Sequence, residues 1–378
     1  MRPPRPSRQT RGTAAVAPTP PTDPAPDTDT SLPRQQRRGH GRPTLQDVAA
    51  LAGVTSITVS RFLREPAVVA EATAARIRQA LADTGYVPNR QAGHLASGSS
   101  AVVAALVPNL AQSIFAETVQ GLSDGLHAAG HELLLGCTDY SMEREESQLR
   151  ALLGWGPGAI VVTGRHHSRG ALTLLRNARA DGTPVIELWD QRPQAGGFTQ
   201  VGFDHAGVGH AMAEHLLGLG HRRLAYVDSG VIEDVRAHER SDGFALRLRT
   251  TKAQLVSLTA NTGDPFDAGR QALQAIRARP GPAPTAIAFA NDQLACGALL
   301  EAQRLGLAVP AELALMGFGD FSIGRQLTPS LSTIRPPRYD IGLQAAQALL
   351  QALADGHDAP HRPLAWQLLP RGSTVAPA

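Results

Sequence analysis

The stretch GVTSITVSRFLREP, residues 53–66, combines short hydroxyl side chains with arginine. Three of its hydroxyl groups suit hydrogen bonds to phosphate oxygens, those of Thr55, Thr58 and Ser60. Arg61 can donate two parallel hydrogen bonds to guanine O6 and N7. Ser56 and Ile57 precede it, and an apolar side chain such as Ile57 can contact the methyl group of thymine. Residues of these types indicate a segment that reads DNA.

Two short helices joined by a tight turn would position these side chains. Thr44 and Asp47 have the spacing of a capping box, although aspartate replaces the usual glutamate or glutamine. The first helix would follow, with apolar residues at helical intervals: Leu45, Val48, Ala49 and Ala52. Gly53 ends it, because glycine adopts a left-handed backbone at little cost. Thr55 is suited to cap the second helix.

The second helix is expected to bury one face and to expose the other. Its buried face would hold Val59, Phe62 and Leu63. The exposed face would then hold Ser56, Ile57 and Arg61. A third helix over residues 72–83 completes a bundle that need not bind DNA. The cap, the glycine turn and the outward polar face together favour a helix-turn-helix headpiece over residues 42–87, with its second helix in the major groove.

From residue 101 onward, short apolar runs rich in β-formers alternate with helical stretches. The apolar runs are AVVAALVP, HELLLGC, AIVVTG, PVIELW, RRLAYVDS, LVSLT, TAIAFAND and LALMGFGD. The helical stretches are 113–129, 141–154, 205–219, 235–250, 265–278 and 292–305. This alternation predicts parallel sheets flanked by helices. We expect two α/β lobes within residues 101–374, divided near residue 200, with chain crossings back near 320–335 and a ligand at the carboxyl ends of the strands.

Composition narrows the class of protein. The 378 residues carry a formal net charge of only +3, so any basic patch is local. Residues 1–41 lack hydrophobic periodicity and are expected to be disordered, either as an inert extension or as a basic arm on DNA. Cys137 and Cys296 are expected to be buried free thiols, as in a reducing cytoplasm. Neither a membrane-spanning run nor a secretory signal is expected.

Other patterns argue against catalysis. GVGHAM at residues 207–212 lacks the third glycine or alanine of a dinucleotide loop and falls within a predicted helix. His205, His210 and His215 recur every five residues, which places them on different faces of a helix rather than around a metal. The sequence has neither a GxSxG nor a CxxC motif. We therefore expect no enzyme, no cofactor and no metal site.

Two long segments, TLQDVAALAGVTSITVSRFL and IRQALADTGYVPNRQAGHLASG, resemble the headpiece of the lactose-repressor family of bacterial regulators. GHRRLAYV, ERSDGF, AIAFANDQLACGAL and LALMGFGD extend the resemblance to residues 42–374. Within the family, RPTLQDVA, TVSRFLREP and VGFD are most similar to the gluconate-operon repressor branch. The resemblance implies an all-α helix-turn-helix headpiece followed by a two-lobed α/β domain with parallel sheets, similar to a periplasmic binding protein.

The resemblance also implies a hinge over residues 88–100 that folds into a short helix on operator DNA. Leu95 matches a leucine that wedges into the minor groove, and Asn89 is a further DNA-binding candidate in the same segment. Gly93 replaces better helix formers of the family, at a cost of about 0.5–1 kcal/mol of helix stability. Ala70 stands where the family often has a serine that caps the third helix.

By the same resemblance, an effector binds between the lobes. Arg240, in ERSDGF, matches an arginine that binds effector hydroxyl or carboxylate groups. Asp292, in AND, matches an acidic acceptor of sugar hydroxyls, and Asn291 beside it is either a helix cap or a contact. Further candidate effector-binding residues are Phe115, Arg165, His167, Trp189, Asp190 and Asp320.

Four of these further candidates have specific interpretations. Arg165 and His167 resemble a pair in the gluconate branch, and with Arg240 they would suit a carboxylate that carries hydroxyl groups. Trp189 could stack on a sugar or lie in the core. Asp190 could bind effector or pair with Arg192 as an ordinary surface charge.

We therefore expect a cytoplasmic, sequence-specific transcriptional regulator. It would be a repressor that binds near-palindromic operator DNA as a homodimer, or alternatively as a tetramer, with no membrane partner. A small sugar or sugar acid such as gluconate would release it through different affinities for the DNA-bound and free states. The rival expectation is a periplasmic-type sugar-binding protein without a DNA role, which shares the two-lobed fold but lacks a headpiece.

Overall fold

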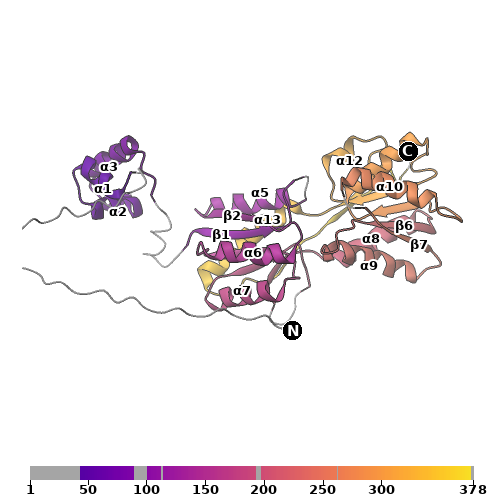
Figure 1. The fold of residues 1–378 in the computed structure, drawn as a ribbon, viewed down its shortest axis with the longest axis horizontal. Helices are drawn as coiled ribbons and strands as arrows, with labels where there is room; N and C mark the ends of the chain where they lie inside the picture. Colours follow the sequence, from indigo (N-terminus) through magenta and orange to yellow (C-terminus); the bar gives the residue numbers. More distant parts are fainter. Residues whose placement is uncertain (1–42, 89–99, 112–113, 193–196, 262, 376–378) are drawn as a thin grey trace, which may run out of the picture. The chain divides into compact units, whose positions relative to one another are not determined.

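The computed structural model describes residues 43–88, 100–111, 114–192, 197–261 and 263–375 (Figure 1). The chain divides into two compact units, Met1–Pro88 and Asn89–Ala378. We call residues 43–88 the headpiece and the described residues from 100 to 375 the core domain. Across these described ranges, no helix combines the length and the apolar character needed to cross a membrane.

The headpiece is a small helical bundle, which confirms the predicted helix-turn-helix. Its elements are α1 (Leu45–Ala52), α2 (Ser56–Arg64), the short 3-10 helix η1 (Pro66–Val68) and α3 (Glu71–Thr84). The Thr44 hydroxyl accepts from the Asp47 N–H (3.3 Å), and the Asp47 carboxylate accepts from the Thr44 N–H (2.7 Å). Gly53 follows α1 with φ of 65°. α3 begins without a side-chain cap, because Ala70 has no acceptor.

The first lobe of the core domain is built on a six-stranded parallel sheet in the order β11-β5-β4-β3-β1-β2. Its strands are β1 (Val102–Val107), β2 (Glu132–Cys137), β3 (Ala159–Thr163), β4 (Val185–Leu188), β5 (Thr199–Gly202) and β11 (Arg362–Pro363). Its helices are α5 (Phe115–His127), α6 (Met142–Leu153), α7 (Arg169–Ala180) and α13 (Arg338–Asp355). In Figure 1 the yellow helix α13 lies among the magenta helices of this lobe.

The second lobe has a sheet in the order β12-β10-β9-β8-β6-β7, parallel except where β12 pairs with β10. Its strands are β6 (Arg223–Asp228), β7 (Gln254–Thr259), β8 (Ala286–Phe289), β9 (Ala314–Phe318), β10 (Ser332–Arg335) and β12 (Gln367–Leu369). Its helices are α8 (His205–Gly218), α9 (Val235–Arg249), α10 (Pro265–Arg277), α11 (Asp292–Arg304) and α12 (Ser322–Gln326). The chain passes between the lobes after β5, after β10 and between β11 and β12.

Paired glycines set the distance between neighbouring helices. Each of three packed helix pairs, α5 with α13, α8 with α9 and α10 with α11, has a glycine on both helices where the backbones meet: Gly121 and Gly342, Gly209 and Gly243, Gly269 and Gly297. A Cβ atom on Gly209 would lie 1.8 Å from the carbonyl oxygen of Arg240, and one on Gly243 would lie 2.1 Å from that of Ala206. Gly209, the second glycine in GVGHAM, therefore allows α8 to pack closely on α9.

Two sequence-based expectations need correction. β5 and β10 were not among the predicted strands, because they carry buried polar residues instead of an apolar run; the Thr199 hydroxyl, for example, donates to the carbonyl of Ala359 (2.6 Å). Cys296 is buried as expected, but Cys137 is exposed. Cys137 ends β2, and an edge strand has a neighbour on one side only.

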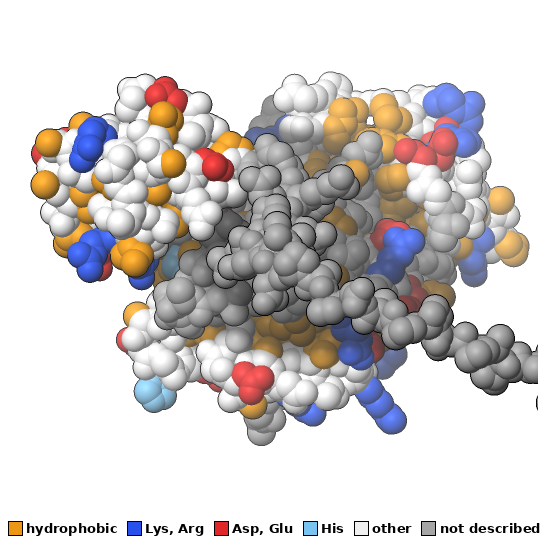
Figure 2. Space-filling model, turned by 60° about the vertical axis from the view of Figure 1, so that its left-hand side comes forward, with side chains coloured by type: hydrophobic (Ala, Val, Ile, Leu, Met, Phe, Trp, Pro, Cys, Tyr) orange, Lys and Arg blue, Asp and Glu red, His pale blue; other side chains and the backbone are white. Residues whose placement is uncertain are grey.

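Figure 2 shows how charged side chains are distributed on one face of the described residues. On the face shown in Figure 2, arginines and carboxylates of the described residues are interspersed, without one large field of either sign. This distribution fits the small formal net charge of +3. Specific recognition must therefore depend on individual side chains rather than on an overall field.

Candidate nucleic-acid interface and ligand cleft

One face of α2 is free for contact with DNA. Val59 and Phe62 point into the headpiece core, while Arg61 is exposed and Ile57 is 72% exposed. An apolar side chain so exposed suits a partner surface such as a base edge. Within residues 43–88, Arg61 has no ion-pair partner, so its guanidinium can donate to a base.

The hydroxyl residues of α2 divide into two groups. Thr55 caps the helix: its Oγ1 accepts from the Thr58 N–H (3.2 Å) and also lies 2.9 Å from the Thr58 hydroxyl. Ser56 and Ser60 are half-buried on the same helix. The N-terminal end of α2, with its free N–H groups, suits a phosphate oxygen. Asn89 and Leu95, the two hinge candidates, lie outside the described residues.

The larger of the two pockets in the cleft has polar and aromatic walls from both lobes. This Arg240 pocket is roughly 720 Å³ in volume, open solvent included, and lies beyond the carboxyl ends of β1, β2, β6, β8 and β9. It is lined by Asn109, Ala111, Ile114, Tyr140, Ser229, Asp234, Arg240, Pro265, Ala290, Asn291, Gln293, Phe318 and Phe321. Parallel sheets commonly bind ligands at this edge.

Arg240 is the buried cation of this pocket. Its side chain donates to the carbonyls of Arg236 (3.1 Å) and Ala290 (3.2 Å), and its guanidinium lies 4.1 Å from the ring centre of Phe318. Arg240 is only 5% exposed, and its Nε has no hydrogen-bond partner among the described residues. No carboxylate in that part of the chain forms an ion pair with it. A buried cation without a counter-charge is costly, and an anionic ligand would remove that cost.

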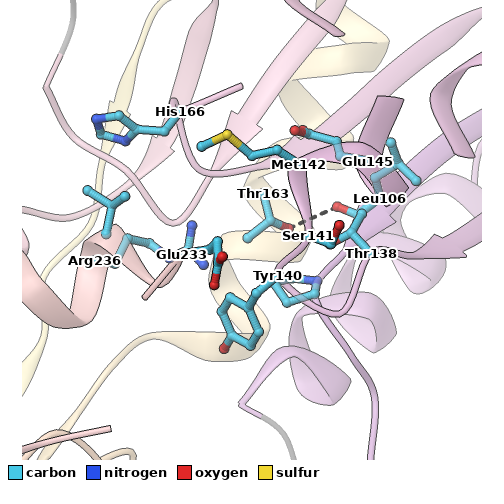
Figure 3. Close-up of a pocket in the computed structure, with 12 residues that line it drawn as sticks. Leu106, Thr138, Tyr140, Ser141, Met142, Glu145, Thr163, His166, Glu233 and Arg236 are labelled. Atoms are coloured by element: carbon cyan, nitrogen blue, oxygen red, sulfur yellow. Dashed lines mark hydrogen bonds between the residues drawn. The ribbon is translucent and has the colours of Figure 1, made fainter. Parts of the chain in front are cut away.

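A second pocket, the Glu145 pocket, lies beside the first and shares Tyr140 with it. It is roughly 500 Å³ in volume, open solvent included, and is lined by Leu106, Pro108, Thr138, Tyr140, Ser141, Met142, Glu145, Thr163, His166, Glu233, Val235 and Arg236. In Figure 3, Glu233 and Arg236 come from one side of the space, and Tyr140, Ser141 and Glu145 come from the other. The Thr163 hydroxyl is already bonded to the Leu106 carbonyl (3.0 Å).

His167 lies behind the Glu145 pocket rather than on its wall. Its Nδ1 is 2.6 Å from Glu145, and its Nε2 is 3.5 Å from Glu187. Burial by itself would lower the pKa of His167, but the hydrogen bonds and charges of Glu145 and Glu187 raise this pKa to about 9. His167 therefore contacts the Glu145 carboxylate from behind, while Glu145 lines the pocket.

Arg165 and Asp190 belong to an ion-pair cluster that joins the lobes. The Arg165 guanidinium, in the first lobe, contacts Asp190 (3.3 Å) in that lobe and Glu239 on α9 in the second. Arg192 also reaches Glu239 (3.7 Å). Of the two roles left open for Asp190, pairing with Arg192 is not the one seen, because Asp190 pairs with Arg165. These side chains lie beside the pockets and connect the lobes.

Trp189 and Phe115 pack against each other in the hydrophobic core. The Trp189 indole N–H donates to the Thr118 hydroxyl (3.1 Å), and its ring meets Phe115 edge-on with centroids 5.3 Å apart. Both aromatic side chains are fully buried and line neither pocket. Of the two roles that the sequence left open for Trp189, the structure therefore places it in the core rather than against a ligand.

The two buried aspartates of the second lobe face away from the pockets. Asp292 accepts from the Thr333 hydroxyl (2.6 Å) and the Phe321 N–H (2.9 Å), and Asp320 pairs with Arg335 and Arg371 (2.6 Å each). Asn291, next to Asp292, both caps α11 and lines the Arg240 pocket. Of the two neighbours, Asp292 is bonded to Thr333 on β10 and to the Phe321 N–H, whereas Asn291 lines the pocket.

Several pocket residues escaped the sequence analysis. Tyr140, Asp234 and Arg236 follow the ends of β2 and β6, where the one available signal is their position after an apolar run. Backbone strain marks the same edge, since Asp139 (φ 52°), Tyr140 (φ 61°), Trp189 (φ 65°) and Asp320 (φ 54°) all follow strands there. Left-handed residues other than glycine persist where the surroundings hold them in place, commonly at ligand sites.

Burial of Asp292 makes folding stability depend on pH. Desolvation raises the pKa of this carboxyl to about 6, well above the usual value of an aspartate. The folded protein therefore holds the proton more tightly, so this group stabilises most below about pH 4, and its contribution is lost as pH rises toward about 6. The loss is roughly 3 kcal/mol at most.

Asp292→Asn should remove this dependence. We expect the unfolding free energy of the variant, relative to the unchanged protein, to rise by up to roughly 3 kcal/mol between about pH 4 and pH 7, measured by urea unfolding. Because the measured quantity is the difference in unfolding free energy between the two proteins, the contributions of all other titrating groups cancel. A difference that stays constant with pH would show that Asp292 is ionised throughout.

Comparison with known protein families bears on both sites. A profile for bacterial regulatory proteins of the lacI family matches residues 44–89. A profile for periplasmic binding protein-like domains matches residues 213–374. The two matches cover the headpiece and most of the second lobe together with its connections.

Relatives of known class align with nearly the whole chain. The HTH-type transcriptional regulator GntR of Pseudomonas aeruginosa is 39% identical over 320 residues, which are 84% of this chain and 91% of that protein. GntR of Escherichia coli K12 is 33% identical over 336 residues, which are 89% of this chain and 98% of that protein.

Solved structures give the same result. A LacI-family transcriptional regulator from Silicibacter pomeroyi superposes with a TM-score of 0.81 at 31% identity, covering 88% of this chain and 99% of that one. The lac repressor dimer bound to operator and the anti-inducer ONPF superposes with a TM-score of 0.77 at 25% identity, covering 89% and 100%.

Proposed function

The chain belongs to the lacI family of bacterial regulatory proteins, and from this premise we propose that it is a repressor that a small sugar acid releases from its operator. It is a DNA-binding transcriptional regulator and not an enzyme. A periplasmic-type binding protein without a DNA role would have no use for the headpiece. We propose further that the protein acts in the cytoplasm as a homodimer, so that two headpieces read two half-sites of a near-palindrome.

The observation that carries the choice of effector is the unpaired Arg240 cation. A ligand carboxylate would supply the missing counter-charge, and the buried guanidinium can bind it with two parallel hydrogen bonds. Asn291, Ser229 and Asp234 on the same walls suit the hydroxyl groups of a polyhydroxy acid. The GntR relatives at 39% and 33% identity support gluconate as the first compound to test.

Release would follow from a change in the angle between the lobes. The effector pocket has walls on both lobes, and the Arg165–Glu239 ion pair joins them beside it. A ligand that binds one lobe angle more tightly shifts the protein toward that angle. The shift changes the spacing of the two hinges in the dimer and thus the affinity for operator DNA.

A titration with three classes of compound tests this function. Thermal shift and operator release are measured with gluconate, with other sugar acids and with neutral sugars. We expect a sugar acid to raise the melting temperature and to release the operator, while neutral sugars do neither. Stabilisation by neutral sugars alone would contradict the proposed class of effector.

Arg61→Ala tests the proposed reading face of α2. Losing a bidentate contact to guanine should weaken operator binding by about 1–3 kcal/mol and relax the preference for one base pair. Binding is measured by fluorescence anisotropy on the operator and on scrambled DNA. Arg78→Ala, an exposed arginine of α3 with a surface ion pair to Glu71, is the control. An equal loss on both DNAs would show that Arg61 contacts phosphate only.

A further inference from the structure

His205 lies between the two lobes and directly against Arg240. It is the first residue of α8 and is 1% exposed. Its Nε2 is 2.8 Å from the carbonyl oxygen of Trp189, the residue that follows β4 in the first lobe. Its Nδ1 is 3.0 Å from Nη1 of Arg240, on α9 in the second lobe. The ring thus connects the first lobe to the buried cation of the Arg240 pocket.

These two partners define the protonation of the ring. A carbonyl oxygen can only accept, so Nε2 must carry the proton, and a guanidinium N–H can only donate, so Nδ1 must be the acceptor. The ring is therefore neutral in one defined tautomer. Burial and the nearby positive charges of Arg240 and Arg236 lower the pKa of His205 well below its usual value, which agrees with a neutral ring.

We propose that His205 is a positioning residue, which accepts an Arg240 N–H at Nδ1 and so holds the guanidinium in the orientation that binds the effector's carboxylate. The inference rests on the proposed function only in the identity of the effector. The other bonds of the Arg240 side chain go to main-chain carbonyls of the second lobe, on α9 itself and after β8. His205 links the guanidinium, through its bond to the Trp189 carbonyl, to the first lobe. Its ring is fixed in turn by Phe203, with centroids 4.4 Å apart.

Two substitutions separate the two hydrogen bonds. The amide of asparagine reaches as far as Nδ1 of histidine, so His205→Asn can keep the acceptor for Arg240 and lose the bond to Trp189. The amide of glutamine reaches as far as Nε2, so His205→Gln can keep the bond to Trp189 and lose the acceptor. Both variants lose the imidazole ring. If the ring had only a structural role, both substitutions would therefore weaken gluconate binding equally.

Gluconate affinity is measured by calorimetry for the full-length protein and the two variants. We expect His205→Gln to bind gluconate about 10-fold more weakly, the effect of one hydrogen bond to a charged group, and His205→Asn to remain within about threefold of the unchanged protein. In an Arg240→Ala background, His205→Gln should cause no further loss, because the two residues act as a unit. Equal weakening in both variants, or additive losses, would overturn the proposal.

A measurement without effector separates this inference from the proposed function. NMR of isotope-labelled arginine side chains should show a restrained Arg240 guanidinium in the unchanged protein and in His205→Asn, but not in His205→Gln. If the unchanged protein fails to bind gluconate, the proposed effector is wrong, and this signal still decides the role of His205. A restrained guanidinium in His205→Gln would overturn the positioning role.

Discussion

Replacing Arg240 by alanine is expected to abolish the response to a sugar acid while operator binding survives. The guanidinium is buried, lies over Phe318 and has no carboxylate partner among the described residues, so a ligand carboxylate would be its counter-ion. Hydrogen bonds to charged groups contribute about 1.5–3 kcal/mol, so affinity for gluconate should fall by about 10- to 150-fold. Calorimetry gives the affinity, and anisotropy gives operator binding.

Two further variants sharpen that test. Arg249→Ala removes an exposed arginine from the end of the same helix, α9, and should leave both affinities unchanged. Arg240→Lys keeps the charge but loses the planar pair of donors, so its affinity should lie between those of the unchanged protein and Arg240→Ala. If Arg240→Ala still releases the operator at the original gluconate concentration, the cleft assignment is wrong.

Gly209→Ala is expected to destabilise the protein more than any other glycine-to-alanine substitution in the α8–α9 pair. The added Cβ would lie 1.8 Å from the Arg240 carbonyl oxygen and 2.8 Å from the Phe244 nitrogen, both backbone atoms that cannot turn aside. Overpacking commonly costs about 1–3 kcal/mol, and contact with backbone places this variant at or above the upper end. Because α9 must move, gluconate affinity should fall as well.

The control lies on the same helix. Gly218 ends α8, and a Cβ there would meet nothing within 4 Å. Gly218→Ala should therefore be neutral or stabilise by about 0.4–1 kcal/mol, through a less flexible unfolded chain. Thermal and urea unfolding of both variants give the comparison. Equal stability of the two would mean that the helices separate at no cost and that the close crossing is not needed.

Much of the fold was predictable because its signals are local. The capping box of Thr44 and Asp47, the left-handed Gly53 and the inward spacing of Val59 and Phe62 all act within a few residues, and the structure has each of them. The apolar strands and most of the helices between them were recognised for the same reason. β5 and β10 were not, since their buried polar residues bond to segments distant in the chain, such as Ser332 to Arg371.

The ligand cleft was predictable in outline only. Its location follows from parallel strands, whose carboxyl ends meet at one edge, and Arg240 was found through a family motif. Which side chains face the pocket was not predictable, because neighbours at a strand end point in different directions. The Asp292 carboxylate accepts a hydrogen bond from Thr333, 41 residues further along, whereas Asn291 lines the pocket.

By itself, therefore, the sequence determined the helix-turn-helix, the apolar strands and most of the helices, because helix caps and hydrophobic periodicity depend on neighbours along the chain. The tertiary structure alone decided the state of the buried polar groups. It placed Trp189 in the core, paired Arg165 with Glu239 across the lobes and left Arg240 with a neutral histidine instead of a carboxylate. Burial and long-range partners set the charge and direction of such groups, and neither is encoded in local spacing.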